Sequence, residues 1–459
     1  MSQPMETLRQ ALERFQQQHL LDDWSRLTDS ERQNLLQQIE TLNLPLVQQL
    51  YRKSQEDHTR IDLSRMEPVP ITPADHNASD AIAAGSEAIT RGEVAALVVA
   101  GGQGTRLRCD QPKGMFEIGP VSNCTLFEIH AEKILARSRR HGGRIPYLVM
   151  TSPATEAETK SFVAEKRYFG LPVEDVIFFC QGTMPAVDAA NGRILQEAPG
   201  KLALSPNGHG GALPALRDHG LLDELRRRGV RHIYYFQVDN PLTKIADPLF
   251  VGQHILARSE VSSKVVPKLS PQDRVGNFVL VDGRCSMIEY INLPKELAEA
   301  RDVDGRLRIR AANPAIHIFD LEFLRRMAEE KTALPYHIAR KCVKHWDGKQ
   351  VVEPKSENAL KFEMFIFDLL PRADRWLLVE TTHREEFAPL KNMQGPDSPE
   401  TVKAAMCNQA RDWLAHAGIH VEPRDDWPLE ICPLFALDAD EFAARVPAGE
   451  KVAGPRYWK

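Results

Sequence analysis

The sequence predicts an α/β fold built on a Rossmann-like sheet that is mixed but mostly parallel, with a helical N-terminal unit and a small C-terminal domain. From about residue 80 onward, short apolar runs alternate with helical stretches, which is typical of parallel sheets with helices on both faces. The first sixty residues show helical spacing without strand signals. An Asp-Gly turn between β-prone runs at 275–284 adds antiparallel strands to the expected sheet.

The N-terminal unit, residues 1–75, is expected to be a helical bundle followed by a linker. Apolar residues at helical spacing, such as Leu35 and Ile39, predict its helices, and Thr28 with Glu31 predicts a capping box at the start of one of them. The proline-rich stretch 67–73 interrupts any helix and predicts an extended connector along the next domain. We expect this part to be a docking unit without chemistry.

Residues 76–384 are expected to form the catalytic domain, and residues 385–459 a smaller domain with an amphipathic helix near 400–415. The predicted buried strands are 95–100, 147–150, 176–179 and 232–238, and the predicted helices are 126–137, 155–169 and 220–228. Ligands in sheets of this kind bind beyond the carboxyl ends of the strands. The loops that follow the apolar runs are therefore the candidate site.

Composition narrows the classes of function. The chain has 459 residues, a formal charge of −5 and a sequence pI of about 6.3, so it offers no general basic field to nucleic acid or anionic membranes. No apolar run approaches the roughly 20 residues of a membrane span, and the N-terminus lacks a signal-peptide pattern, so we expect a cytoplasmic protein. Seven scattered cysteines without a CxxC pair indicate neither a zinc site nor a disulfide framework.

A glycine-rich loop follows the first predicted strand of the catalytic domain. Gly101, Gly102 and Gly104 allow positive φ and close approach of the backbone to a ligand, and successive N–H groups in such a turn form an anion-binding nest. Arg106 and Lys113 bracket this nest, which suits the many oxygens of a triphosphate. The simpler alternative is a tight strand-to-helix turn with surface cations.

Two other phosphate-binding motifs do not fit this loop. The dinucleotide fingerprint G-x-G-x-x-G lacks its third glycine, because Leu107 occupies that place. No G-x-x-x-x-G-K-[ST] string of a P-loop can be laid over the segment. The loop therefore indicates a nucleotide-binding protein of another kind.

The string G-G-x-G-T-R-L…P-K at 101–113, which includes Thr105, resembles the signature of nucleotide-sugar pyrophosphorylases. The likeness extends over most of the chain after residue 90 and looks closest to the UDP-N-acetylhexosamine pyrophosphorylases and the related UDP-glucose enzymes. It implies a GT-A-like nucleotidyltransferase fold that transfers a uridylyl group from UTP to a sugar 1-phosphate. One position departs from the family, which usually has glycine where this chain has Arg108.

Further segments resemble family motifs in the same order along the chain. They are the helix start at 125–128, the glutamine-glycine segment at 181–185, the second glycine-rich loop at 206–211, the acidic strand end at 237–240, and the late motifs at 362–368 and 387–392. The resemblance assigns substrate contacts to Gly101, Gly102, Gly104, Thr105, Gln181, Gly208, His209, Gly210, Asp239, Glu289 and Asn313.

The chemistry of these residue types agrees with the implied roles. Gln181 can match the donor–acceptor edge of uracil, and Asp239 at a strand end can hold Mg²⁺ that bridges phosphate oxygens. Arg106 is expected to hold the leaving phosphates, Lys113 the charge at the α-phosphate, and Lys391 the phosphate of the sugar. The simpler alternatives are a surface amide for Gln181, a helix N-cap for Asp239 and a surface lysine for Lys391.

The sequence leaves the sugar open. We expect N-acetylhexosamine 1-phosphate, and glucose 1-phosphate is the alternative. Two features favour the alternative: His209 resembles the P-G-H-G loop of UDP-glucose pyrophosphorylases, and 312–317 departs from the N-acetylhexosamine form. Two alternatives belong to other classes. A nicotinamide-dependent oxidoreductase is disfavoured by the missing third glycine, and an inactive sugar-nucleotide sensor is disfavoured by the retained cations and carboxylate.

Overall fold

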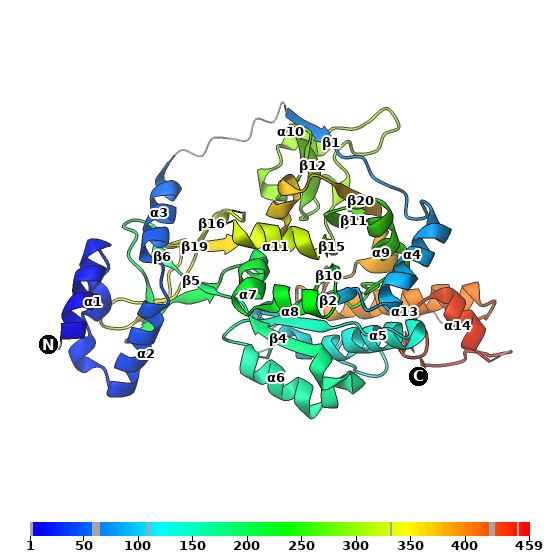
Figure 1. Cartoon of the computed structure of the whole chain (residues 1–459), viewed down its shortest axis with the longest axis horizontal. Coiled ribbons are helices and arrows are strands. Elements are labelled where there is room, and N and C mark those ends of the chain that lie inside the picture. Colours follow the sequence, from blue (N-terminus) through cyan, green and yellow to red (C-terminus); the bar gives the residue numbers. More distant parts are fainter. Residues whose placement is uncertain (1–2, 57–64, 108–110, 331–332, 422–426, 448) are drawn as a thin grey trace. The chain divides into compact units, whose positions relative to one another are not determined.

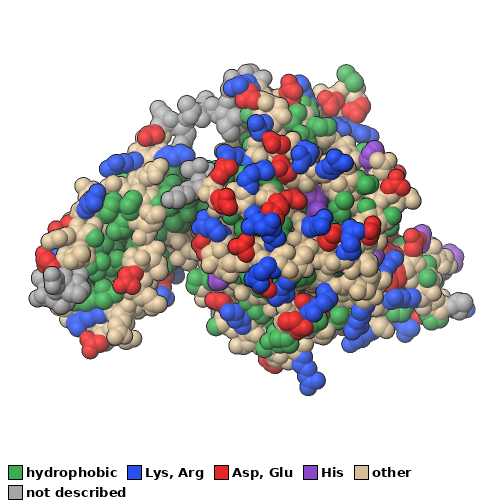
Figure 2. Space-filling view, in the orientation of Figure 1, with side chains coloured by type: hydrophobic (Ala, Val, Ile, Leu, Met, Phe, Trp, Pro, Cys, Tyr) green, Lys and Arg blue, Asp and Glu red, His purple; other side chains and the backbone are tan. Residues whose placement is uncertain are grey.

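The structure, a computed structural model, describes residues 3–56, 65–107, 111–330, 333–421, 427–447 and 449–459. The chain divides into two compact units. Unit 1 consists of Met1–Ile61, Gln181–Gly211 and Leu334–Asp368, and unit 2 of Asp62–Cys180, Ala212–Ala333 and Leu369–Lys459. No helix in the described part of the chain is both long and apolar enough to cross a membrane. Lys/Arg and Asp/Glu side chains are interspersed over the part of unit 2 drawn in Figure 2, as the nearly balanced composition leads one to expect.

Unit 2 is built on a mixed sheet that has eleven strands within the described residues (Figure 1). Its strands are β1 (Met66–Pro68), β2 (Val94–Val99), β3 (Tyr147–Thr151), β4 (Val176–Cys180), β10 (His232–Gln237), β11 (Val261–Pro267), β12 (Asn277–Val281), β13 (Arg284–Ile288), β14 (Ala311–Ala312), β15 (His317–Asp320) and β20 (Trp376–Glu380). The strand order is β1-β12-β14-β11-β15-β10-β2-β3-β4, with β13 on β12 and β20 on β11. The strands β10, β2, β3 and β4 are parallel neighbours, whereas β15 is antiparallel to β10 and β11. Farther along, the pair β21 (Leu429–Ile431) and β22 (Arg456–Trp458) is parallel.

The parallel part of this sheet is buried on both faces. Ala96 and Val98 of β2 belong to the main core cluster, and Ala95 and Leu97, which point to the opposite face, are equally buried. A continuous apolar run therefore forms a strand here without alternating polar residues. The register pairs Gln237 of β10 with Val99 of β2, so the loops after these two strands leave the same edge of the sheet.

Unit 2 also contains helices. They are α4 (Ala78–Thr90), α5 (Leu126–His141), α6 (Glu156–Glu165), α7 (Ala212–Asp218), α8 (Leu221–Arg227), α9 (Pro248–Leu256), α10 (Lys295–Glu299), α11 (Leu321–Glu329), α12 (His383–Glu386), α13 (Pro399–His416) and α14 (Ala439–Arg445). The helices α4 and α9 approach closely because glycine lies at their crossing: a Cβ on Gly85 would be 2.0 Å from the carbonyl oxygen of Pro248. The predicted start of α5 is present, since the side chain of Thr125 accepts a hydrogen bond from the amide of Glu128.

The antiparallel strands expected between 261 and 320 are also present. The strands β12 and β13 form a hairpin whose turn residues, Asp282 and Gly283, have φ of 53° and 76°, as the Asp-Gly signal predicts. The proline-rich connector contributes to the sheet as well, because β1 pairs with β12 and Thr72 bridges Val379 of β20. The mixed α/β fold class is confirmed.

Unit 1 combines N-terminal helices with small antiparallel sheets. The helices are α1 (Gln3–Arg14), α2 (Asp29–Glu40) and α3 (Leu44–Gln55). The strands are β5 (Thr183–Pro185), β6 (Val187–Asp188), β7 (Gln196–Ala198), β8 (Lys201–Leu202), β9 (Leu204–Pro206), β16 (Tyr336–Lys341), β17 (His345–Trp346), β18 (Val351–Val352) and β19 (Ala359–Met364). They pair as β16-β19-β6, β5-β9, β7-β8 and β17-β18. The predicted capping box of Thr28 and Glu31 opens α2.

The two units differ from the division 1–75, 76–384 and 385–459 that the sequence suggests. Leu12 and Leu35 of the N-terminal helices share one hydrophobic cluster with Val187 and Phe362, so two later segments belong to unit 1. Residues 385–459 belong to unit 2, although they contain a small cluster of their own around Phe442. Burial of apolar faces, and not position along the chain, decides the grouping.

Candidate active site

The first glycine-rich loop leaves β2 at the carboxyl edge of the sheet and folds back on the segment 111–113. The hydroxyl of Ser152 donates to the carbonyl of Gly101 at 2.8 Å, and the amide of Lys113 donates to the carbonyl of Gly102 at 3.2 Å. Thr105 begins a short 3-10 turn, Thr105–Leu107. Arg108, where the chain departs from the family pattern, lies outside the described residues.

The backbone amides of this loop are less available to a ligand than the sequence predicts. The amide of Gly104 donates to the carbonyl of Gln111 at 3.3 Å, so it is used within the loop. Gly102 lies outside the left-handed region, and a Cβ built on it would meet nothing within 4 Å. Glycine at position 102 therefore leaves open space beside the loop, and positive φ is not the reason for it.

An ion pair joins this loop to the end of β10. The Nζ of Lys113 donates to Oδ2 of Asp239 at 2.8 Å, and the two side chains are only 18% and 17% exposed. Asp239 follows β10 by two residues, and Gly101 follows β2 by two, so the register of these strands places both at one edge. The alternative reading of Asp239 as a helix N-cap is not what the structure shows, because no helix starts directly after it among the described elements.

Lys391 comes to the same place through the segment after α12. The amide of Leu390 donates to the carbonyl of Asp239 at 2.8 Å, and the amide of Lys391 donates to the carbonyl of Asp397 at 2.8 Å. Its ammonium group lies 5.9 Å from the ring centre of Phe387. Backbone hydrogen bonds thus hold Lys391 beside the carboxylate of Asp239. This arrangement argues against the alternative that Lys391 is an ordinary surface lysine.

These residues line one pocket of about 320 Å³, which we call the basic pocket. Its lining residues are Gln103, Gly104, Arg106, Leu107, Lys113, Asp239 and Lys391. With one carboxylate against three cations, the lining carries a net positive charge. A pocket of this charge at the carboxyl ends of parallel strands is suited to a polyphosphate.

The sequence did not predict a role for Asn240, which joins two segments of the basic pocket. Asn240 donates from its side chain to the carbonyl of Glu386 at 2.6 Å, and its Oδ1 accepts from the amide of Ala388 at 3.1 Å. It is 2% exposed and therefore links the Asp239 turn to the segment that carries Lys391. A polar residue directly before Pro241 at the end of an apolar strand was the available signal.

His130 of α5 also contacts the turn that carries Asp239. Its Nε2 lies 2.9 Å from the carbonyl oxygen of Val238, the residue before Asp239. Burial lowers the pKa of His130 to about 3, so the ring is neutral and donates one hydrogen bond to this carbonyl. The backbone on which Asp239 stands is therefore fixed from two sides.

Unit 1 brings Gln181 together with the second glycine-rich loop. The ladder of β5 and β9 pairs Thr183 with Pro206, and the amide of Asn207 donates to the carbonyl of Gly182 at 3.0 Å. Gln181 itself is 6% exposed, which argues against the alternative of a surface amide. The family-like segments 181–185 and 206–211 are thus neighbours in space.

The glycines of the second loop are used differently from the expectation. Gly208 has φ of 86°, and a Cβ on it would lie 2.4 Å from the carbonyl oxygen of Met364. A Cβ on Gly210 would lie 2.7 Å from the carbonyl carbon of Met364. The close approach that requires glycine is therefore to the chain's own strand β19.

His209 belongs to an aromatic cluster. Its ring stacks on Phe365 with centres 5.3 Å apart, and the ring of His337 lies 4.4 Å from the same phenylalanine. The amide of Ile366 donates to Nδ1 of His209 at 3.3 Å. Burial, with a smaller contribution from His337, lowers the pKa of His209 to about 4, so the ring is neutral near pH 7 and Nε2 carries its proton.

Glu289 and Asn313 lie at one end of the antiparallel part of unit 2. Asn277 of β12 pairs with both Ile288 and Ala312, the residues directly before them. Oδ1 of Asn313 accepts from the amide of Ala315 at 2.8 Å. Both side chains are half-buried, and neither lines the basic pocket.

Asp239 is the candidate metal ligand, and it is the one carboxylate in the described part of the chain that lines the basic pocket. Within the described residues, no group of three or more His, Cys, Asp or Glu side chains could hold a metal ion. Mg²⁺, however, usually keeps several waters and needs only one or two carboxylates when phosphate oxygens complete its shell. One carboxylate beside a polyphosphate pocket fits that chemistry.

The chain matches a family model described as UTP–glucose-1-phosphate uridylyltransferase over residues 45–446. It is 39% identical over 348 residues to a UDP-N-acetylglucosamine pyrophosphorylase of Saccharomyces cerevisiae, covering 74% of this chain and 73% of that protein. It is 35% identical to UDP-N-acetylhexosamine pyrophosphorylase-like protein 1 of Xenopus tropicalis, covering 90% of this chain and 86% of that protein.

Two solved structures from Trypanosoma brucei are similar to different degrees. The uridine diphosphate N-acetylglucosamine pyrophosphorylase in complex with inhibitor has a TM-score of 0.85 and 28% identity, covering 99% of each chain. A UDP-glucose phosphorylase has a TM-score of 0.63 and 19% identity, covering 86% of this chain and 82% of that one. The second likeness is one of fold.

Proposed function

Because this chain belongs to the family of UTP–glucose-1-phosphate uridylyltransferases, we propose that it transfers the uridylyl group of UTP to an N-acetylhexosamine 1-phosphate and releases pyrophosphate. The observation that carries the proposal is the basic pocket. It gathers Arg106, Lys113, Asp239 and Lys391 from distant parts of the chain at the carboxyl edge of the sheet.

In the proposed reaction, an oxygen of the sugar 1-phosphate attacks the α-phosphorus of UTP. The new P–O bond forms while the bond to the bridging oxygen of pyrophosphate breaks and its electron pair leaves with the pyrophosphate. This transfer requires no covalent intermediate on the protein, so positioning and stabilisation of negative charge account for catalysis. The basic pocket offers both.

Lys113 is the group we assign to the α-phosphate. Its ion pair with Asp239 holds the ammonium in the pocket before substrate binds, so little reorientation is needed when phosphate oxygens arrive. Arg106 is assigned to the β- and γ-phosphates, because its planar fork suits two oxygens at once. Asp239 would hold Mg²⁺ together with phosphate oxygens, and the ion would neutralise charge that develops on them.

Lys391 is assigned to the phosphate of the sugar. The hydrogen bonds that fix its segment to Asp239 and Asp397 keep its position set by the fold. Gln181, buried beside the second glycine-rich loop, is assigned to the uracil edge, since its amide offers both an acceptor and donors. Gly208, His209 and Gly210 of that loop, with Glu289 and Asn313, are assigned to the nucleoside and the sugar.

N-acetylhexosamine 1-phosphate is preferred over glucose 1-phosphate on two grounds. The relative at 39% identity is named a UDP-N-acetylglucosamine pyrophosphorylase, and the relative at 35% identity is named a UDP-N-acetylhexosamine pyrophosphorylase-like protein. The structural similarity is also greater to the N-acetylglucosamine enzyme than to the UDP-glucose enzyme.

The test is a pyrophosphate-release assay with purified full-length protein, UTP and Mg²⁺. N-acetylglucosamine 1-phosphate, N-acetylgalactosamine 1-phosphate and glucose 1-phosphate are compared by kcat/KM. We expect an N-acetylhexosamine 1-phosphate to be preferred. Preference for glucose 1-phosphate would replace the sugar assignment, and absence of turnover with all three would contradict the proposed function.

Glucose 1-phosphate remains a second candidate because of one residue. His209 stands where the N-acetylhexosamine enzymes tend to have asparagine, and its neutral ring is held by Phe365 and Ile366. His209→Asn should raise the preference for the N-acetylated sugar if the histidine favours glucose. An unchanged ratio of kcat/KM values would remove the ground for this candidate.

A further inference from the structure

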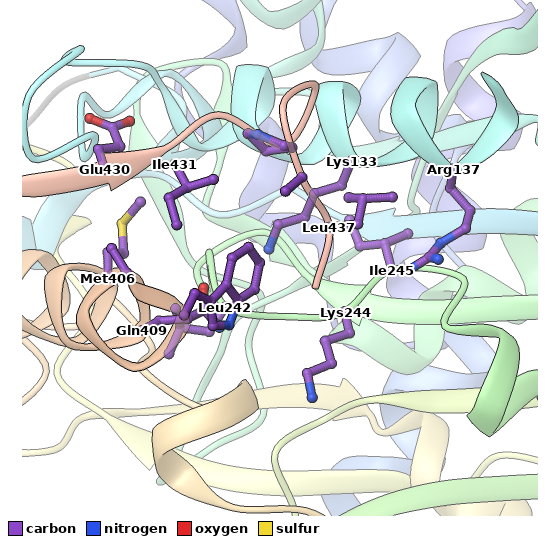
Figure 3. Close-up of a pocket in the computed structure, with 14 residues that line it drawn as sticks. Lys133, Arg137, Leu242, Lys244, Ile245, Met406, Gln409, Glu430, Ile431 and Leu437 are labelled. Atoms are coloured by element: carbon purple, nitrogen blue, oxygen red, sulfur yellow. The ribbon is translucent and has the colours of Figure 1, made fainter. Parts of the chain in front are cut away.

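A second cation-lined cavity lies beside α5, away from the lining of the basic pocket (Figure 3). It has a volume of about 60 Å³, and we call it the α5 pocket. Its lining comes from α5, the segment after Asp239, α13 and the region around β21 and α14: Lys133, Arg137, Leu242, Lys244, Ile245, Met406, Gln409, Ala410, Trp413, Glu430, Ile431, Pro433, Ala436 and Leu437.

Arg137 is the first unusual feature of this pocket. It is 5% exposed, yet among the described residues its Nε has no hydrogen-bond partner and the guanidinium makes no ion pair. Arginine keeps its charge even when buried, so a guanidinium without an ion pair or a hydrogen-bond acceptor at Nε costs free energy. Figure 3 shows Arg137 extending from α5 toward Ile245, at the wall of the cavity.

Lys133 lies one turn before Arg137 on the same face of α5. Its Nζ donates to the carbonyls of Pro241 and Thr243, the latter at 2.9 Å. An ammonium has three donors, so these two bonds leave one for a ligand. Burial lowers the pKa of Lys133 to about 7, with Lys244 and Arg137 lowering it further and Glu386 opposing them. A bound anion would favour its charged form.

The acidic groups near the cavity have other partners. The carboxylates that act on Arg137 from a distance are Asp247, Asp438 and Glu441: Asp247 pairs with Lys264, and the other two pair with Arg140. Glu430, the one carboxylate among the lining residues, accepts from the amides of Val121 and Ser122 at 2.8 Å each and from the Ser122 hydroxyl at 2.6 Å. Lys244 is paired with Glu385 at 2.9 Å. The positive charge of Arg137 and Lys133 therefore has no counterpart in the lining.

We infer that the α5 pocket binds a small oxyanion, held by the guanidinium of Arg137 and the third donor of Lys133, with the apolar walls around it. An anion there supplies the charge and the acceptors that the buried cations lack. This inference does not depend on the proposed function, because it concerns a separate cavity.

The size of the cavity limits the ligand. A single water needs roughly 10–15 Å³ of such space, so the α5 pocket has room for about four to six non-hydrogen atoms. Inorganic phosphate and a short carboxylate such as propionate both have this size. Pyrophosphate and nucleotides are too large. The apolar wall of Leu242, Met406 and Trp413 suits the hydrocarbon end of a carboxylate, whereas phosphate would use its extra oxygens on Lys133.

The site also contacts the active-site turn. Pro241 and Thr243, whose carbonyls accept from Lys133, follow Asp239 by two and four residues. Phosphate can also bind in the basic pocket, so the measurement must separate the two sites. Saturating UTP occupies the nucleotide part of the basic pocket but leaves Lys391 open to phosphate, so the variants of Arg137 provide the separation.

The test is isothermal titration calorimetry of the full-length protein with inorganic phosphate and, separately, with propionate, both in saturating UTP. We expect at least one anion to bind with Kd at or below about 1 mM and Arg137→Met to weaken it at least about tenfold. Arg139→Met is the matched control, because Arg139 is an exposed arginine of the same helix and should leave binding unchanged.

A folding defect is separated from a binding defect by thermal unfolding and by Arg137→Lys. The lysine keeps the charge but not the fork, so it should retain part of the affinity that methionine loses. Binding of phosphate alone or propionate alone supports the site and identifies the class of oxyanion. Binding of neither, or equal binding by wild type and both Arg137 variants, would overturn the inference.

Discussion

The two glycine-rich loops use the same residue for different physical reasons. In the first loop, a side chain at Gly102 would point into open space, and the charged groups of the basic pocket lie nearby. In the second loop, a side chain at Gly208 or Gly210 would collide with the backbone of Met364. The first loop leaves room for a ligand, whereas the second makes room for the protein itself.

This difference shows that a cluster of glycines does not by itself reveal what the glycines make room for. The polar residues beside each loop separate the two cases. The first loop is bordered by the ion pair of Lys113 and Asp239, which is nearly buried and close to further cations. The second is bordered by stacked rings of His209 and Phe365 and by a register that holds β19.

Lys113→Ala should abolish most of the activity while the protein stays folded. Loss of one preorganised cation at the reacting phosphate costs about 10²–10³-fold in kcat. The measurement is steady-state pyrophosphate release with N-acetylglucosamine 1-phosphate and saturating UTP. Lys451→Ala, which removes an exposed lysine elsewhere in unit 2, should be neutral. Near-normal turnover of Lys113→Ala would refute its assigned role.

Gly208→Ala should act on folding. An alanine at φ of 86° is strained, and its Cβ at 2.4 Å from the Met364 oxygen forces the loop from β19. We expect the free energy of unfolding to fall by about 2–4 kcal/mol, as for a strained and overpacked site. Urea unfolding followed by circular dichroism measures it. A stability equal to wild type would mean that the second loop is not packed as described.

Stability should depend on the protonation of His209. Its pKa is about 4 in the folded chain, below its ordinary value near 6.5, so the unfolded chain binds the proton first as the pH falls. The neutral, packed His209 therefore contributes roughly 1–3 kcal/mol to the free energy of unfolding. This contribution is fully present above about pH 6.5 and is lost as the pH falls toward 4. Urea unfolding at several pH values compares wild type with His209→Asn. Parallel pH profiles would contradict the neutral, packed histidine.

Gly102→Ala should have the smallest effect on folding. Because nothing lies within 4 Å of the added Cβ, the free energy of unfolding should change by less than about 0.5 kcal/mol. The methyl group would nevertheless enter the space beside the basic pocket, so kcat/KM for UTP should fall by about tenfold. A destabilisation as large as that of Gly208→Ala would erase the distinction between the two loops.

Much of the candidate site could be predicted from the sequence because it depends on local pattern. Apolar runs ending in polar loops predicted β2 and β10, and the loops after these runs, which carry Gly101 and Asp239, were the predicted candidate site. The register of the two strands places both residues at one edge. The capping box of Thr28 and Glu31 and the Asp-Gly hairpin depend on neighbouring residues only, and both formed as expected.

What remained hidden depends on contacts between distant segments. The sequence does not show that Asn240 holds the Lys391 segment, that Gly208 faces Met364, or that strands after residue 180 cover the N-terminal helices. It also does not show that the buried Nε of Arg137 lacks a hydrogen-bond partner.

The α/β class, the strand ends that carry the polar residues, and a family likeness that implies UTP as substrate follow from the sequence. Periodicity and short motifs are sufficient for these because they act over a few residues. The folded arrangement is needed to see that one pocket is lined by Arg106, Lys113, Asp239 and Lys391, and that the glycines of the two loops make room for different things. Pocket charge and backbone clearance arise where remote segments meet, and no local pattern records that meeting.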